Sequence, residues 1–84
     1  MKLQVFSIFD EKAQVYKAPM FIPHKGEALR TFSDITKNQE TLIAKHPEDY
    51  KLYLLGTFDD NSGKMEPLAE PEFLINATDY SNVT

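Results

Sequence analysis

The chain has 84 residues, of which 42% are hydrophobic and 26% are charged, a composition typical of one ordered globular domain. It contains no cysteine, which excludes a disulfide framework, a thiolate zinc site and redox chemistry at sulfur. The net charge of −4 is uneven: residues 1–58 carry +1 and residues 59–84 carry −5, so the acidic second part opposes phosphate binding.

Polar and apolar side chains alternate over residues 2–9, which predicts a β-strand. Because this opening is not an unbroken apolar run, we expect neither a signal peptide nor a membrane span, and therefore a protein of the cytoplasm. Residues 10–13 form a polar turn, and residues 14–17 return antiparallel with an undetermined register. Pro19 and Pro23 bracket residues 20–22, which form an edge strand or an extended connection because proline withholds a backbone donor.

An amphipathic helix is predicted over residues 26–39. Apolar side chains recur there at three- and four-residue spacing and form one stripe, made of Ala28, Leu29, Phe32 and Ile35. Glu27 near the start and Lys37 near the end suit the helix macrodipole. Residues 42–44 either extend the helix by a turn or form a separate packed loop, and Pro47 ends it in both cases.

A second strand is predicted over residues 51–58, followed by a turn at 59–64 in which Gly63 is free to take positive φ. Residues 65–69 can pair back despite Pro67, giving the order β-β-α-β-β. We expect a domain over residues 1–70 and an acidic, polar C-terminal tail over residues 71–84. The apolar triplet at 73–75 docks on the exposed edge or across a dimer, or serves as a short partner-binding segment.

These elements predict an α+β fold, in which one helix packs on one face of a small antiparallel sheet and the other face is partly apolar. The helix stripe is best matched by the set Leu3, Val5, Leu52, Leu54 and Phe58. The opposite face then shows Phe6, Ile8, Tyr53 and Leu55. An apolar patch of this kind usually marks an interface, and a short chain gains stability from one.

Two uses of that opposite face are open. The first is a homodimer or larger oligomer, with Ile8 and Leu55 as the interface residues. The second is single-stranded DNA, with bases stacked on aromatic rings and phosphates met by lysines. The residues expected to bind DNA are Lys2, Phe6, Tyr16, Lys17, Lys51 and Tyr53. The excess of apolar over charged side chains favours partner contact, and both uses can coexist.

No catalytic, metal or cofactor site is predicted. His24 and His46 are the only histidines, and neither has the neighbouring ligands that a metal site requires. The acidic pairs at 48–49 and 59–60 are typical of turns, and no set of nucleophile, base and orienting residue can be assembled. We therefore expect a protein that is not an enzyme and that uses no cofactor.

Two segments of this chain resemble a known family. They are the stretch from His46 to Lys64, HPEDYKLYLLGTFDDNSGK, and the opening MKLQVFSIFDEKAQ. Together they resemble the small nonstructural protein of gokushoviruses, which are single-stranded DNA phages of the microvirus family. Such proteins are usually described as DNA-binding or as factors for single-stranded DNA synthesis, so the resemblance implies a role in phage genome replication in the host cytoplasm.

Two functions of different classes follow. In one, the protein binds single-stranded DNA and supports viral replication and single-strand synthesis. In the other, it is a non-enzymatic interaction module that acts on the phage replication initiator or on a host replication factor without touching DNA. Salt-dependent binding to an oligonucleotide distinguishes the two, because phosphate contacts release counterions.

Overall fold

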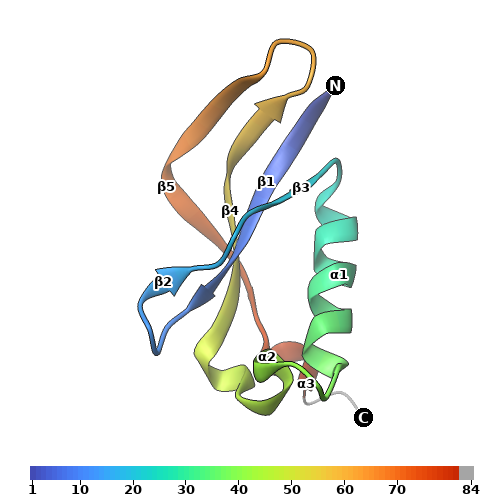
Figure 1. Cartoon of the computed structure of the whole chain (residues 1–84), viewed down its shortest axis with the longest axis vertical. Helices are drawn as coiled ribbons and strands as arrows, with labels where there is room; N and C mark the ends of the chain where they lie inside the picture. The colour runs from blue at the N-terminus through green and yellow to red at the C-terminus, as the bar shows by residue number, and fades with distance from the viewer. Residues whose placement is uncertain (82–84) are drawn as a thin grey trace.

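The computed structural model describes residues 1–81. Its elements in chain order are β1 (Lys2–Asp10), β2 (Val15–Tyr16), β3 (Met20–Ile22), α1 (Lys25–Lys37), α2 (Leu42–Lys45), η1 (Pro47–Asp49), β4 (Tyr50–Asp59), β5 (Lys64–Asn76) and α3 (Thr78–Ser81). All pairings are antiparallel, in the order β2-β1-β4-β5, and β3 pairs with the same edge of β1 as β2 (Figure 1). The predicted α+β fold with one main helix on an antiparallel sheet is confirmed.

The first hairpin turns as predicted, and its turn is held by the Asp10 side chain. Asp10 Oδ1 accepts hydrogen bonds from the backbone N–H groups of Lys12 and Ala13 at 3.0 and 3.1 Å. Gln14 closes the turn at a φ of 60°, and β2 then pairs Tyr16 with Phe9. The short strand β3 lies at the sheet edge, which confirms one of the two alternatives for residues 20–22.

Helix α1 covers one face of the sheet, which we call the covered face (Figure 1). Its buried Ala28 and Phe32 come from the predicted stripe, and Leu29 and Ile35 pack beside them. The core consists of Phe6, Ile8, Ala28, Phe32, Ile43, Tyr50, Leu52 and Ala77. Residues 42–44 belong to the separate short helix α2, whose first turn is capped by Thr41 Oγ1 accepting from the N–H of Ala44 at 3.1 Å.

The predicted assignment of strand faces is right for part of β4 and wrong for β1. Leu52 and Leu54 do lie with the core, but their partners across β1 are Ile8 and Phe6. The cause is a bulge: β1 pairs Val5 with Gly56 and Phe6 with Leu54, which leaves Leu55 without a partner on β1. One extra residue reverses the phase of β4 relative to β1. Leu3, Val5 and Phe58 therefore lie on the opposite face, which we call the open face.

Strand β5 is much longer than predicted, and the proposed division at residue 70 is wrong. Residues 71–76 continue β5 and pair with β4, as Phe73 does with Tyr53. Ala77 is fully buried in the core, and the ring of Tyr80 stands 6.2 Å from that of Phe32. Residues 71–81 thus belong to the domain because they complete its sheet and core. Residues 82–84 of the predicted tail lie outside the described part of the chain.

Strand β5 bows away from β4 near its middle (Figure 1). The ladder pairs Gly56 with Pro67 and Leu54 with Glu72, so Leu55 on β4 is spanned by residues 68–71 on β5. On the Lys64 side of this bow the two backbones approach closely. A Cβ at position 56 would collide with the carbonyl oxygen of Glu66 and lie 2.8 Å from the Cα of Pro67. Only glycine fits there without a shift of the backbone.

Candidate functional site

Four aromatic rings form a continuous series across the open face, each from a different strand. This aromatic row consists of Phe9, Tyr16, Tyr53 and Phe73. In strand order, neighbouring ring centroids lie 4.7 Å apart for Tyr16 and Phe9, 5.9 Å for Phe9 and Tyr53, and 5.8 Å for Tyr53 and Phe73. Tyr16 and Tyr53 also contact each other, with centroids 5.6 Å apart. Tyr16 is 43% exposed and Phe73 is 48% exposed, so the row ends in accessible rings on β2 and β5.

The cations near the aromatic row are only partly free. Lys51 lies two residues before Tyr53, on the same face of β4, and its Nζ stands 2.6 Å from Glu11 Oε2. Lys17 Nζ lies 5.8 Å from the centroid of the Tyr50 ring, within the range of a cation–π contact. The row is therefore bordered by Lys51, which is already paired with a carboxylate, whereas Lys17 lies over a core ring of the covered face.

The structure brings together three of the residues predicted to bind DNA and separates the other three. Tyr16 and Tyr53 stand in the aromatic row, with Lys51 on the same face of β4 as Tyr53. Lys17 instead lies over the ring of Tyr50, a core residue of the covered face. Phe6 is fully buried under α1, so its predicted role in stacking is wrong. Lys2 lies at the other end of β1, roughly 23 Å from Phe9 at the usual rise per residue.

The predicted oligomer interface also changes. Ile8 is a core residue and cannot form an exposed interface, so that assignment is wrong because the bulge turns Ile8 toward α1. Leu55 is half-buried at the bulge. Sequence reasoning missed Phe9 and Phe73. Phe9 could have been found from its two-residue spacing from Ser7, which places it on the same face of β1. Phe73 gave no such signal, because Pro71 precedes it and the segment resembled a polar tail.

A groove with an apolar lining lies on the open face, beside the bow of β5. It encloses about 310 Å³, and we call it the apolar groove. Its lining residues are Val5, Pro19, Leu55, Gly56, Thr57, Met65, Glu66 and Pro67. A second aromatic contact also belongs to this face, with the rings of Phe21 and Phe58 5.5 Å apart.

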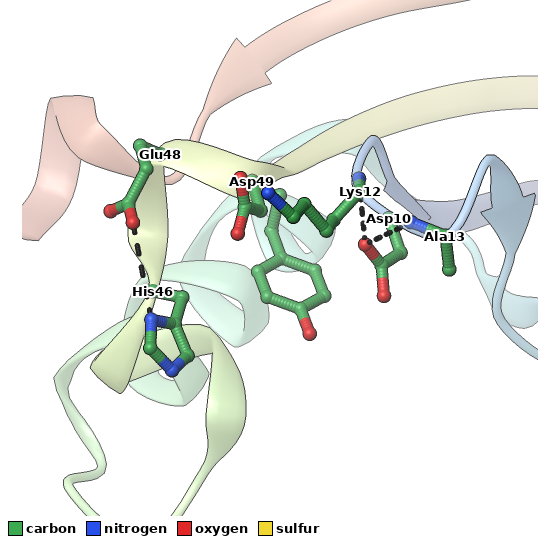
Figure 2. Close-up of a pocket in the computed structure, with 7 residues that line it drawn as sticks. Asp10, Lys12, Ala13, His46, Glu48 and Asp49 are labelled. Carbon is green, nitrogen blue, oxygen red and sulfur yellow. Dashed lines mark hydrogen bonds and ion pairs between the residues drawn. The ribbon is translucent and has the colours of Figure 1, made fainter.

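A second hollow, of about 640 Å³, lies between the first turn and η1, and is shown in Figure 2. Its lining residues are Asp10, Lys12, Ala13, His46, Glu48, Asp49 and Tyr50. Asp10 is engaged with the turn backbone, and His46 Nδ1 stands 3.9 Å from Glu48 Oε1 at an exposed position. Burial, aided by the nearby carboxylate of Asp10, raises the pKa of the Tyr50 phenol. These groups hold loops together, as expected of acids in turns.

Within residues 1–81, no three His, Cys, Asp or Glu side chains are grouped so that they could hold a metal ion. His24 is the N-cap residue of α1 and makes no side-chain capping bond. In the same part of the chain, every helix is too short or too polar to cross a membrane.

Comparison with known proteins identifies the family. No solved structure matches the chain. Protein ORF5 of Chlamydia phage 1 is 29% identical over 85 residues, which cover 95% of this chain and 88% of that relative. The family described as Phage ORF5 protein matches residues 3–80. The chain therefore belongs to the Phage ORF5 protein family, which confirms its resemblance to the nonstructural proteins of gokushoviruses.

Proposed function

We propose that this phage nonstructural protein binds single-stranded DNA through the aromatic row and thereby supports viral genome replication and single-strand synthesis. The observation that carries the proposal is the series of four rings across the sheet, open at Tyr16 and Phe73. Sheet aromatics bind unpaired bases by stacking, which tolerates any sequence because every base has a π-face. Duplex DNA keeps its bases stacked internally and offers no such faces.

Stacking must supply most of the affinity. The pairing of Lys51 with Glu11 and the position of Lys17 over Tyr50 leave few cations free for phosphates near the row. We expect modest binding with a shallow salt dependence, equivalent to about three to five released ions. The proposed activity is non-enzymatic, needs no cofactor or metal, and takes place in the host bacterial cytoplasm.

The same ion pair favours a second candidate function. Because Glu11 neutralises Lys51 at 2.6 Å, the aromatic row offers a protein partner an apolar surface with little charge. In this alternative the protein contacts the phage replication initiator or a host replication factor and no DNA. Self-association, predicted from the short chain, also stays a prediction, and it cannot use Ile8, which is buried in the core.

Binding of a fluorescently labelled single-stranded oligonucleotide, followed by anisotropy at low salt, tests the proposal. Tyr16→Ala should weaken binding by about 1–3 kcal/mol, the usual value of one stacked base. Phe21→Ala is the matched control, because Phe21 is also an edge aromatic that is 43% exposed but lies outside the row. Tyr53→Ala should act like Tyr16→Ala, and duplex should bind less well than single strand.

The outcomes separate the two functions. Equal losses from Tyr16→Ala and Phe21→Ala would mean that the row is not the binding surface. If the folded wild-type protein binds no oligonucleotide even at low salt, DNA binding is ruled out and the interaction module becomes the working hypothesis.

A further inference from the structure

The outer edge of β5 has no strand partner within residues 1–81. In the order β2-β1-β4-β5 it ends the sheet, and it is thirteen residues long. Residues 64–73 are all exposed, including Met65 at 54% and Leu68 at 38%. A long exposed edge with apolar side chains readily accepts an added strand from another chain.

The apolar groove begins at this edge. Met65 and Pro67 of β5 line it together with Val5, Pro19 and Gly56. Its volume of about 310 Å³ lies at the lower end of the range for binding pockets, which suits one or two apolar side chains and not a large ligand. The edge and the groove can therefore be contacted by one extended chain.

The charge of the edge selects its partner. Glu66, Glu70 and Glu72 follow one another along β5, and none of them forms an ion pair within the described residues. Lys64 at the start of the strand is the only cation in β5. An added strand therefore gains from lysine or arginine side chains and is repelled if it is acidic.

A second copy of this edge is a poor occupant in the register centred on the middle of the exposed stretch. When two β5 strands pair antiparallel about Ala69, Glu66 of each copy stands opposite Glu72 of the other. Like charges directly opposite each other in a ladder are destabilising. Pro67 and Pro71 also remove two backbone donors from the edge, so pairing depends more on side-chain complementarity than it would at an ordinary edge.

We propose that the edge of β5 and the apolar groove bind an extended peptide segment of a partner protein in which cationic and apolar side chains alternate. Met65 and Pro67 pair with Phe58 and Gly56 and line the groove. Glu66 between them also borders the groove, but alternation along β5 turns its side chain to the other side of the sheet. An added strand with the same period of two places its apolar side chains beside the groove. Its cations then lie beside the glutamates.

Anisotropy of a labelled peptide of about ten alternating lysine and valine residues tests this proposal. The triple variant Glu66→Gln, Glu70→Gln and Glu72→Gln should weaken binding at least about tenfold, since several charge pairs are lost. A matched control carries the same charge change on exposed acids of α1 and the loop after it, in the triple variant Glu27→Gln, Asp34→Asn and Glu40→Gln. This control should keep most of the affinity.

The contribution of the groove is tested separately with Met65→Ser, which should also weaken binding of the peptide. Its control is Leu42→Ser, because Leu42 is similarly exposed at 59% but lies in α2. Hydrogen exchange should show new protection of amides within residues 64–76 when the peptide binds. Tyr16→Ala should leave peptide affinity unchanged, so failure of this proposal is distinguishable from failure of DNA binding.

Several results would overturn the proposal. A peptide of alternating glutamate and valine that binds as well as the lysine peptide would remove the charge argument. If a peptide of alternating lysine and glycine bound with equal affinity, the groove would have no part in binding. Equal losses from both triple variants would indicate attraction by net charge alone. A β5 triple variant that shifts the mass in light scattering would assign the edge to a second copy.

Discussion

The two faces of the sheet are both apolar, yet only one is closed. On the covered face, Phe6 and Leu52 of the sheet and Phe32 of α1 are fully buried against one another. On the open face, rings touch one another but Tyr16, Phe21 and Phe73 remain between 43% and 48% exposed. The side chains of the covered face are already buried and stabilise the fold. The side chains of the open face are only partly buried, so a ligand or partner can bury the rest of their surface.

The difference also separates two ways of packing. The covered face mixes aliphatic and aromatic side chains from the sheet with those of two helices and of Ala77 after β5. The open face relies on ring contacts between strands, each worth about 0.5–1.5 kcal/mol beyond its burial. Substitutions should therefore divide by face, with stability changes on one side and binding changes on the other.

The largest expected effect comes from truncating matched phenylalanines on the two faces. Phe32→Ala should lower the free energy of unfolding by about 3–5 kcal/mol, enough to unfold much of so small a domain. Phe73→Ala should cost about 1 kcal/mol, because nearly half of that side chain is already in water. Urea denaturation followed by circular dichroism measures both. Equal costs would mean that the open face is as tightly packed as the core.

A smaller effect is expected where β4 and β5 approach each other. Gly56→Ala should destabilise by about 1–3 kcal/mol, because its Cβ meets the backbone of Glu66 and Pro67. Gly26→Ala is the control: a Cβ there meets nothing within 4 Å, and the helical site gains about 0.5–1 kcal/mol. Opposite signs in thermal unfolding are the predicted result. A neutral Gly56→Ala would show that the contact between the strands relaxes easily.

The smallest effect is a pH dependence of the covered face. Burial raises the pKa of Tyr50 above its usual 10.0, so the folded state holds this proton more tightly than the unfolded state does. The resulting stabilisation is complete below pH 10.0 and is lost as the pH rises through the folded-state pKa. Tyr50→Phe should reduce the alkaline loss of thermal stability. If the wild type and the variant lost thermal stability equally at alkaline pH, the loss would have to come from other titrating groups.

The sequence predicts the elements well because each has a strong local period. The stripe from Ala28 to Ile35 identifies α1, and alternation identifies β1 and β4. Gly63 takes the expected positive φ of 74° in the turn between β4 and β5. These features depend on neighbours within a few residues, which a single sequence displays directly.

The face assignments and the extent of β5 could not be predicted, because they depend on distant pairing. Nothing local at Leu55 marks a bulge, yet that single residue moves Phe6 and Ile8 into the core. Pro67 and Pro71 interrupt the strand pattern of β5, so that the second half of this strand resembles a polar tail in the sequence. The candidate site was therefore half predicted: Tyr16, Tyr53 and Lys51 were on the correct face, and Phe6 was not.

The bulge at Leu55 has a consequence for comparing relatives of this protein. It divides β4 into two halves whose apolar positions are out of step by one residue, since Leu54 serves the covered face and Gly56 the open face. In a relative that lost this one residue, the side chains of one half of the strand would exchange faces, even with no other change in the sequence. ORF5 proteins should therefore accept a substitution of the bulge residue itself more readily than the insertion or deletion of one residue beside it.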